Sequence, residues 1–376
     1  MRVKLIDPSA FTPPYDRALA AALAAEGADV ELITSEFTYG PVPEPRGYQV
    51  SYDFYRRTST RARRLSKAIS HLPGMRRLER KLESAPAGTV THYQWLTMPR
   101  LDRHLISGRR PRVMTAHYIL PPEPTPRQVR EAAKTFGAMD AVIAHSRLGA
   151  ARLTDEVGLP EDRVRVIPHG VFDYLTEMPR RDLPPELAAD RDDRPPVILF
   201  FGLLRPYKGI DVLLDAVEGM ETGPVPPELW IVGNPLMDLT GLRTRAGRSP
   251  IRVRWLTRFI EDPEIPAIMD RADVLVLPYR DGEQSGVLYT GIAFGKAMVV
   301  ADVGGIGEVA REHGLARLVR PGDADALREE LSELTGPGGA VAREELAART
   351  REAAAGPFAW SEIAKRTLDL YNEVSS

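Results

Sequence analysis

The chain has 376 residues, of which 43% are hydrophobic and 27% are charged, and its net charge is -2. This balance is typical of globular proteins and excludes the disordered and fibrous classes. Cysteine is absent, which excludes disulfides, thiolate metal sites, iron–sulfur clusters and cysteine nucleophiles. No apolar run reaches the roughly 18 residues of a membrane span, and Asp7 precedes any signal-peptide segment. We therefore expect a cytoplasmic protein of about two domains.

Short apolar runs rich in β-branched residues alternate with helix-like stretches through the first 172 residues. Near-continuous apolar strands separated by helices are typical of parallel sheets covered on both faces. The pattern predicts a Rossmann-like domain over residues 1–172. Its expected strands are Val3–Ile6, Val30–Ile33, Thr89–Tyr93, Val113–Thr115, Ala141–Ala144 and Val164–Ile167.

Residues 56–83 carry ten basic side chains against two glutamates. Apolar residues at helical spacing opposite the cations, such as Leu65, Ile69 and Leu72, would suit a helix lying on an anionic membrane surface. A solvated helix packed by its apolar stripe explains the same pattern equally well. The stretch lacks interleaved aromatic residues, so we expect no nucleic-acid partner.

Residues 173–196 are rich in proline and contain the charge cluster Asp190–Asp193, which predicts a linker. A second set of apolar runs follows and predicts a second Rossmann-like domain over residues 197–356. Residues 357–376 show helical spacing of Trp360, Ile363 and Tyr371 and predict a final amphipathic helix. The expected strands of the second domain are Val197–Phe201, Leu229–Val232, Ile251–Trp255, Val274–Leu277, Met298–Ala301 and Leu315–Val319.

Ligands of open α/β sheets bind outside the carboxyl ends of the strands, so the turns after strands are the candidate sites. The turn after Val197–Phe201 contains Gly202, Arg205 and Lys208. Together the two cations could hold a diphosphate, the arginine by bidentate hydrogen bonds and the lysine as a point charge. On this motif alone, two solvated cations on a surface loop are the alternative.

After the strand Val274–Leu277, a polar loop leads into an apolar helix near residue 286. The backbone amides of Ser285, Gly286, Val287 and Leu288 are expected at the helix N-terminus, which favours phosphate. Glu283 is the best-placed acceptor for the hydroxyls of a bound sugar, and helix capping is its alternative role. A third turn, Asp302–Val309, has three glycines in four residues, typical of a tight turn or a close approach to a ligand.

The order and spacing of these three turns resemble those of the retaining glycosyltransferases of family 4, which have the GT-B fold. The resemblance covers essentially the whole chain, because Ile167–Phe172 and the final helix also match. It implies two doubly wound domains facing across a cleft, with the last helix, residues 357–376, crossing back to the N-terminal domain. By the same resemblance, the domain over residues 1–172 binds the acceptor and the domain over residues 197–356 binds the nucleotide sugar. It also implies a metal-independent enzyme whose donor is a nucleoside-diphosphate sugar, most simply a UDP- or GDP-sugar.

Residue by residue, the resemblance makes Arg205 and Lys208 the cations on the donor diphosphate. Glu283 is the nearest match to the first glutamate of the family's two-glutamate motif, displaced by one position. The second glutamate, which holds the donor ribose in the family, falls on Thr290, a weaker hydrogen-bonding partner. His117 matches the histidine placed near the donor sugar, whereas the role of His92 stays open.

The turn after the first strand departs from the family pattern. Relatives carry glycines there that approach the donor phosphate, whereas this chain has Ser9, Ala10 and Phe11 followed by Thr12. The departure indicates a subgroup with its own acceptor. If residues 56–83 lie on a membrane surface, that acceptor is lipid-linked or an anionic glycan, and a small-molecule acceptor is the alternative. We expect no metal, because Asp323 and Asp325 fit a helix cap and Asp190 and Asp192 lie in the linker.

Two other functions remain open. The first is a nucleotide-sugar epimerase or hydrolase on the same fold, which would release free sugar without an acceptor. The second is a protein that binds nucleotide sugars without turnover, conceivable because Thr290 replaces a glutamate and the glycines of the first turn are missing.

Overall fold

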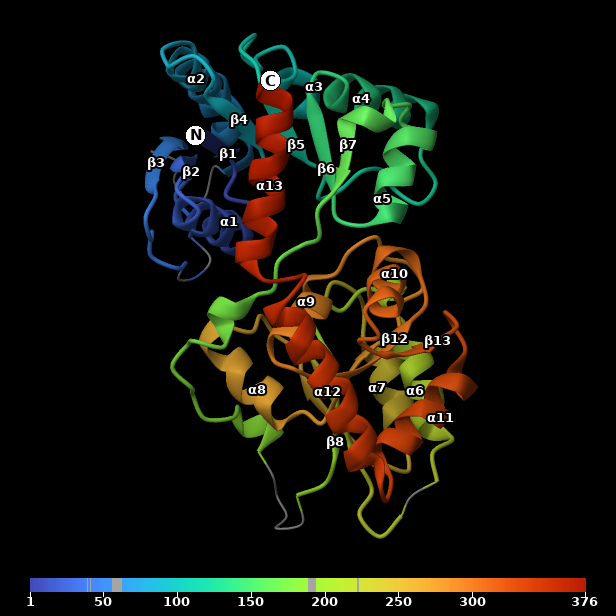
Figure 1. Cartoon of the computed structure of the whole chain (residues 1–376). Coiled ribbons are helices and arrows are strands. Elements are labelled where there is room, and N and C mark those ends of the chain that lie inside the picture. The colour runs from blue at the N-terminus through green and yellow to red at the C-terminus, as the bar shows by residue number, and fades with distance from the viewer. Residues whose placement is uncertain (39, 41, 56–62, 189–193, 222) are drawn as a thin grey trace. The chain divides into compact units, whose positions relative to one another are not determined.

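The computed structural model describes residues 1–38, 40, 42–55, 63–188, 194–221 and 223–376, with only the backbone considered at 63–70. The chain divides into two compact units. Unit 1 comprises Met1–Gly170 and Phe358–Ser376, and unit 2 comprises Val171–Pro357. Both chain ends therefore belong to unit 1 (Figure 1).

Unit 1 is built on a parallel sheet of seven strands in the order β3-β2-β1-β4-β5-β6-β7. Six of these strands overlap the expected runs. The seventh, β3, was not expected, because the expected strands were continuous apolar runs, whereas β3 is an edge strand in which polar and apolar residues alternate. The strands are β1 (Arg2–Asp7), β2 (Asp29–Ser35), β3 (Gln49–Phe54), β4 (Val90–Tyr93), β5 (Arg112–Thr115), β6 (Ala141–Ala144) and β7 (Val164–Val166).

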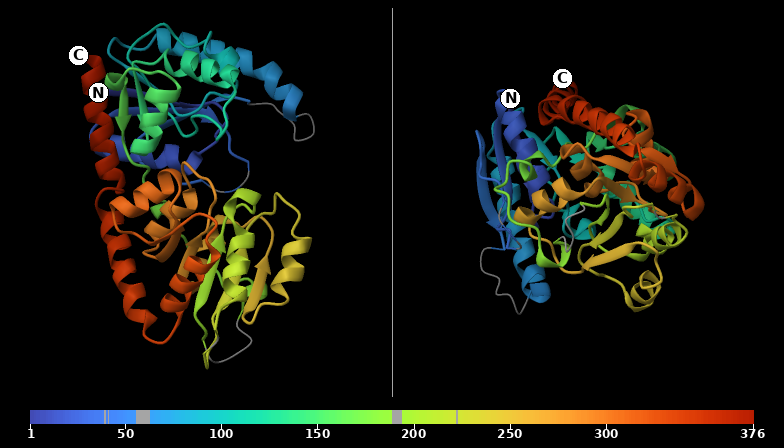
Figure 2. Two further views of the ribbon diagram at one scale, coloured as in Figure 1. Left: turned by 90° about the vertical axis from the view of Figure 1, so that its right-hand side faces the viewer. Right: turned by 90° about the horizontal axis from the view of Figure 1, so that it is seen from below.

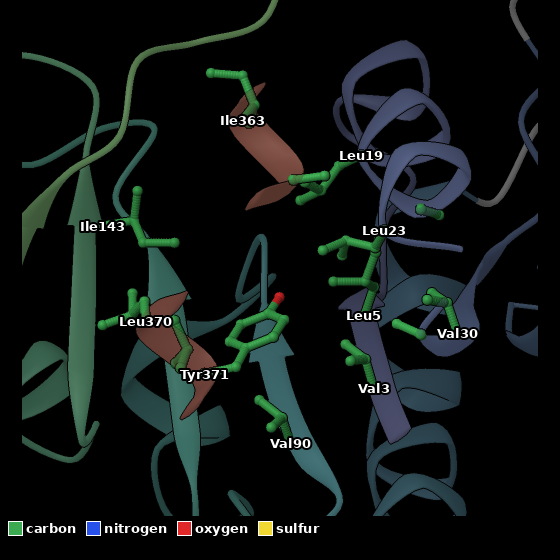
Figure 3. Packing of buried hydrophobic residues seen from close by; sticks show 14 of the residues in the cluster. Val3, Leu5, Leu19, Leu23, Val30, Val90, Ile143, Ile363, Leu370 and Tyr371 are labelled. Carbon is green, nitrogen blue, oxygen red and sulfur yellow. The ribbon is translucent and has the colours of Figure 1, made fainter. Parts of the chain in front are cut away.

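Helices cover both faces of this sheet, and each face has its own apolar cluster (Figure 1). On one face α1 and the C-terminal α13 pack against each other. Figure 1 and the left view of Figure 2 show α13 running along unit 1. Figure 3 shows Ile363 of α13 beside Leu19 of α1, Tyr371 between Leu5 of β1 and Val90 of β4, and Leu370 beside Ile143 of β6. The helices are α1 (Pro13–Ala25), α2 (Arg63–Glu83), α3 (Pro99–Asp102), α4 (Pro126–Phe136), α5 (Arg147–Ala151) and α13 (Trp360–Ser375).

Unit 2 contains a parallel sheet of six strands in the order β10-β9-β8-β11-β12-β13. All six expected runs are strands. They are β8 (Val197–Phe201), β9 (Glu228–Val232), β10 (Arg252–Leu256), β11 (Val274–Leu277), β12 (Ala297–Ala301) and β13 (Arg317–Val319). The helices are α6 (Ile210–Glu218), α7 (Thr240–Ala246), α8 (Ile265–Arg271), α9 (Gly286–Ala293), α10 (Gly304–Glu312), α11 (Ala324–Thr335) and α12 (Gly339–Ala355).

Two Rossmann-like parallel sheets with helices, and a last helix that returns to the first of them, confirm the predicted fold class. In each sheet the strand order reverses beside the first strand, between β1 and β4 and between β8 and β11. Ligands of doubly wound sheets bind at such switch points, outside the carboxyl ends of the strands. The turns after β1, β4, β8 and β11 are therefore where a site is expected.

The proline-rich segment 173–196 packs onto unit 2 where it is described. The Tyr174 hydroxyl donates to Oδ2 of Asp262 at 2.9 Å, and Leu175 and Leu187 are buried. Residues 189–193, which include Asp190 and Asp192, lie outside the described residues. Among the helices that are described, none is long and apolar enough to cross a bilayer.

Candidate active site

A buried lysine follows β8 and lies at the switch point of unit 2. Lys208 is only 7% exposed, and its Nζ donates to the Tyr279 hydroxyl at 3.0 Å. Burial lowers the pKa of Lys208 to about 8. Within the described residues no carboxylate forms an ion pair with it. Because a buried charge is normally paired, an uncompensated ammonium at this edge of the sheet is suited to an anionic ligand.

Glycine residues bring this turn against the rest of unit 2. Gly209 has a φ of 71°, in the left-handed region, and a side chain there would overlap the carbonyl oxygen of Pro278. Gly202 has a φ of 111°, and a Cβ there would lie 3.3 Å from Nζ of Lys208. The missing side chain at Gly202 thus leaves open the space in front of the ammonium.

Tyr279 joins the two predicted anion-binding segments. It is buried just after β11, and its hydroxyl lies 3.0 Å from Nζ of Lys208 and 3.2 Å from Oγ of Ser285. Burial raises the pKa of the Tyr279 phenol, so the group remains uncharged at neutral pH. The sequence interpretation missed this residue, although its position directly after a strand could have indicated it.

Helix α9 begins where the sequence predicts, with Ser285 as its N-cap residue. The Leu288 amide already donates to the Ser285 carbonyl at 3.0 Å. In the described part of the chain, the amides of Gly286 and Val287 make no hydrogen bond. The amides of Gly286 and Val287 are therefore available beside the Lys208–Tyr279–Ser285 cluster, and the positive end of the helix dipole favours an anion there.

The glycine-rich turn supports the loop that carries Glu283. Gly304 has a φ of 55°, and a side chain there would overlap the carbonyl oxygen of Gly282 and approach the amide of Glu283. The third turn therefore packs against the loop before α9, which explains its glycine by a close backbone approach. Glu283 is partly buried on this loop.

Arg205 and Thr290 differ in whether their polar groups are available to a ligand. Arg205 is exposed at the start of the β8 turn, and its guanidinium has no ion-pair partner within the described ranges. Thr290 is buried in α9 and its hydroxyl donates to the Gly286 carbonyl at 2.9 Å. Arg205 is available to a ligand, whereas the Thr290 proton is already used inside its own helix.

In unit 1, histidines follow or end four neighbouring strands, β4 to β7. His117 stacks on Trp95 with ring centroids 5.2 Å apart, and its Nε2 lies 3.0 Å from Oε1 of Gln94. Its Nδ1 lies 3.4 Å from Nε2 of His145, whose Nδ1 donates to the Ile167 carbonyl. His92 is fully buried between the hydroxyls of Tyr371 and Thr115. These contacts make His92 a structural partner.

The histidine cluster is uncharged. Burial lowers the pKa of His117 well below its usual range, with His145 next in effect, and lowers that of His145 to about 4. Gln94 Oε1 and the Ile167 carbonyl oxygen can only accept hydrogen bonds. The single N–H of neutral His117 is therefore on Nε2, and that of neutral His145 is on Nδ1. The lone pairs of His117 Nδ1 and His145 Nε2 therefore face each other, and neither nitrogen of His117 points away from protein atoms.

Two family models match the chain. The model described as Glycosyltransferase Family 4 matches residues 17–172, and the model described as Glycosyl transferases group 1 matches residues 195–336. A D-inositol 3-phosphate glycosyltransferase of Xylanimonas cellulosilytica is 30% identical over 76% of this chain and 71% of its own length. The chain belongs to glycosyltransferase family 4.

Other relatives and structures agree with this family. The phosphatidyl-myo-inositol mannosyltransferase of Mycobacterium leprae is 32% identical over 56% of this chain, which spans about half of that relative. Sucrose-phosphate synthase of Thermosynechococcus elongatus shares the fold with a TM-score of 0.74 and 19% identity, over 99% of this chain and 98% of its own. HepE of Anabaena in complex with UDP-glucose has a TM-score of 0.70 at 19% identity, over 99% and 100%.

Family membership makes the turn after β1 informative. The amides of Ser9, Phe11 and Thr12 donate to the Asp7 carboxylate at 2.5 to 3.3 Å. Ala10 occupies the left-handed region with a φ of 48°, where glycine is the usual residue. The backbone amides that could bind a phosphate at this turn therefore already donate hydrogen bonds to the Asp7 carboxylate of the same chain.

The described part of α2 favours the packed-helix interpretation of residues 56–83. Met75, Leu78 and Leu82 are buried in one apolar cluster of unit 1. Lys81 forms ion pairs with Glu31 and Asp53. Residues 56–62 and the side chains of 63–70 lie outside the described residues, so the described residues give the membrane contact no support.

The described residues contain no group of three or more His, Asp or Glu side chains arranged to hold a metal ion. Asp323 is the N-cap of α11 and accepts a hydrogen bond from the Ala326 amide at 2.9 Å. Its position is therefore explained by helix capping, as expected from the sequence.

Proposed function

We propose that the protein transfers a sugar from a nucleoside-diphosphate sugar to an acceptor hydroxyl with retention of anomeric configuration. The observation that carries this proposal is the buried Lys208 ammonium, uncompensated by any described carboxylate and adjacent to the N-terminus of α9. Such a site suits the charge that develops on a departing diphosphate, and Arg205 adds a second cation.

In the proposed reaction the bond between the sugar C1 and the diphosphate oxygen breaks, and a bond from C1 to the acceptor oxygen forms on the same face. The acceptor hydroxyl proton passes to an oxygen of the departing diphosphate. Lys208, Arg205 and the amides of Gly286 and Val287 stabilise the leaving group, and no residue forms a covalent intermediate. Glu283 accepts hydrogen bonds from the sugar hydroxyls, and His117, whose ring nitrogens face Gln94 and His145, is proposed to contact the substrate through its neutral ring.

The acceptors named for relatives support a hydroxylated acceptor with an anionic or lipid portion. Inositol 3-phosphate and phosphatidyl-myo-inositol appear in the names of two relatives, and glycolipid in that of a Xanthomonas campestris mannosyltransferase. The donor that suits the site is a UDP- or GDP-sugar, without a metal ion.

Calorimetric titration with UDP, GDP and their glucose and mannose conjugates, in magnesium and in EDTA, tests the donor. We expect one base to bind and its affinity to be the same in both buffers. Absence of binding by every nucleotide would overturn the proposal. Release of free sugar at the same rate with and without acceptors would favour the hydrolase instead.

The roles of the sugar-contacting residues are tested by Glu283→Gln and His117→Ala. Loss of a hydrogen bond to a charged group corresponds to about 1.5–3 kcal/mol, or roughly a 10- to 150-fold loss of kcat/KM for Glu283→Gln. Binding of the free nucleotide should stay unchanged in both variants, because neither residue is assigned to the diphosphate. Asp281→Asn, in the same loop, is the matched control for Glu283→Gln. NMR of the product's anomeric proton reports retention.

A further inference from the structure

An apolar cavity of about 630 Å³ lies in unit 1, between the segment that follows β4, the helix α3 and the helix α4. Its wall is formed largely by apolar side chains, including Leu96, Leu101, Met114, Ile119 and Phe136. Protein interiors contain few voids larger than a water molecule, whereas ligand pockets measure about 300–1,000 Å³. The cavity thus has the size and lining of a binding site for an apolar group.

Buried hydrogen bonds hold α3, which forms part of the cavity wall. Asp102, fully buried, accepts a hydrogen bond from the Met98 amide at 2.7 Å and one from Nε2 of His71 at 2.5 Å. Nδ1 of His71 accepts a hydrogen bond from the Tyr55 hydroxyl at 2.7 Å. This buried Asp102–His71–Tyr55 chain holds the end of α3 in place. A preformed wall lowers the entropy cost of binding a ligand.

The charged groups at the cavity are already paired. Glu131 of α4 forms an ion pair with Arg103 at 2.5 Å, and Arg100 approaches the same carboxylate at 3.8 Å. Arg100 stays 59% exposed. The cavity therefore presents no unpaired carboxylate to an occupant, and an apolar group can enter without burying an uncompensated charge.

The cavity adjoins the residues proposed to face the sugar. Trp95 lines the cavity and stacks on His117, with an interplanar angle of 10°. Tyr118, the next residue after His117, lines the cavity and is more than half exposed. A molecule in the cavity thus lies one aromatic ring away from His117.

A second cavity shares the wall made by Trp95 and Leu96, and it has a different lining. Its volume is about 520 Å³, and it carries the hydroxyls of Ser9 and Thr97, whose oxygens lie 2.6 Å apart. Hydroxyls and aromatic rings on one side of Trp95, and apolar side chains on the other, match a molecule with a hydroxylated end and an apolar end.

We infer that the acceptor is a small amphiphile whose single apolar group, an alkyl chain or fused ring system, binds in the 630 Å³ cavity. This inference rests on the proposed transfer function and names its acceptor class. A volume of this size falls within the range of ligand pockets and accommodates an alkyl chain or a fused ring system.

The test compares octyl β-D-glucoside with methyl β-D-glucoside, which carries the same head without the chain, by calorimetry below the micelle concentration. Wild-type protein should bind the octyl compound at least tenfold more tightly. Leu101→Asp, which places a charge on the cavity wall, should remove this preference and leave nucleotide binding unchanged. Leu148→Asp is the control, because Leu148 on α5 is exposed to a similar extent, 42% against 40%, and lies outside the cavity lining.

Ala132→Phe is a second variant that fills the cavity from α4 without adding charge, and it should also reduce the octyl preference. Equal binding of the two glucosides by wild-type protein, or an unchanged preference in both cavity variants, would overturn the inference. Cosedimentation with phosphatidylglycerol vesicles that Leu101→Asp abolishes would overturn it in favour of a membrane lipid. Absence of nucleotide binding beside an intact octyl preference would instead overturn the proposed transfer function alone.

Discussion

The turns after β1 and β8 occupy equivalent places in two sheets of related strand order, yet they present opposite charges. After β1, the Asp7 carboxylate accepts the backbone amides of the turn. After β8, the Lys208 ammonium is buried without a described carboxylate partner. The fold therefore determines where a ligand-binding turn lies, while one or two side chains determine which ligand charge the turn accepts.

Two buried carboxyl groups of unit 1, those of Asp7 and Asp16, increase the difference in charge between the two turns. Burial raises the pKa of Asp7, and burial followed by the charge of Asp7 raises the pKa of Asp16 well above its ordinary value. The Asp7 and Asp16 side chains share a hydrogen bond in this part of unit 1. A diphosphate at this turn would face these two carboxyl groups, so the turn in unit 2 is the better suited of the two to an anion.

The largest effect is expected from Gly209→Ala, which breaks the close packing of the unit 2 turn. The added methyl group would overlap the Pro278 carbonyl oxygen at a φ of 71°. Steric overlap and backbone strain together should lower the free energy of unfolding of unit 2 by about 3 kcal/mol or more. Denaturant unfolding followed by circular dichroism measures the loss.

Gly322→Ala is the matched control for backbone strain. Gly322 has a φ of 80°, but nothing lies within 4 Å of the position of an added Cβ. Only the left-handed conformation is then penalised, at about 1–2 kcal/mol. Equal losses in the two variants would show that contact with Pro278 does not hold the Lys208 turn.

Lys208→Ala should weaken nucleoside-diphosphate binding by about 1.5–3 kcal/mol, or roughly 10- to 150-fold, as expected for a lost charged hydrogen bond. Lys296→Ala removes another lysine of unit 2, whose Nζ donates to the Ala272 carbonyl, and it should leave nucleotide affinity unchanged. Calorimetric titration of both variants with the nucleoside diphosphate measures these affinities. The same affinity for Lys208→Ala and wild type would contradict the diphosphate assignment.

The pKa of Lys208, about 8, adds a pH dependence to this comparison. Above pH 8 the ammonium loses its proton in the free protein, so nucleotide affinity should fall by up to tenfold per pH unit between pH 8 and 9.5. Lys208→Arg should remove this dependence, because the arginine guanidinium stays charged throughout. Parallel pH profiles of the two proteins would show that Lys208 does not contact the ligand.

The buried histidines of unit 1 predict a loss of stability between pH 6.5 and 4. Burial lowers the pKa of His145 to about 4 and those of His92 and His169 to about 3, from 6.5. Below pH 6.5 the unfolded chain binds protons that the folded one does not. Each histidine then removes about 1.4 kcal/mol of stability per pH unit as the pH falls toward 4.

His145→Asn should remove one of these contributions. Between pH 6.5 and 5.0 the variant should lose about 2 kcal/mol less stability than wild type. His104→Asn replaces an exposed histidine and should leave the pH dependence unchanged. Denaturant unfolding at the two pH values provides the comparison, and identical slopes for His145→Asn and wild type would show that His145 is protonated in the folded protein.

Most strands could be predicted because parallel strands buried on both faces are continuous apolar runs. β3 escaped prediction because it is a half-exposed edge strand with a mixed sequence. Gly202, Lys208 and Ser285 could be located because each lies in a local motif after a strand. The contacts of Tyr279, Gln94 and His145 join residues distant in the sequence, so no local pattern reveals them.

The amides of the first turn illustrate the remaining difficulty. The sequence shows that glycines are missing after the first strand, but it does not show that Asp7 takes the amides of Ser9, Phe11 and Thr12. An aspartate at a strand end is compatible with capping, metal binding or solvent exposure. Only the three-dimensional path of the turn distinguishes these roles.

The smallest effect is expected from Thr290→Val, which tests the second position of the family's motif. The Thr290 hydroxyl donates to the Gly286 carbonyl at 2.9 Å, so its proton is not available to a ribose. Only a lone pair of the oxygen could accept a ribose hydroxyl, and a neutral hydrogen bond is worth about 0.5–1.5 kcal/mol. We therefore expect nucleotide affinity to fall by roughly threefold, far less than in Lys208→Ala. A loss as large as that of Lys208→Ala, measured by the same titration, would show that Thr290 fully replaces the missing carboxylate.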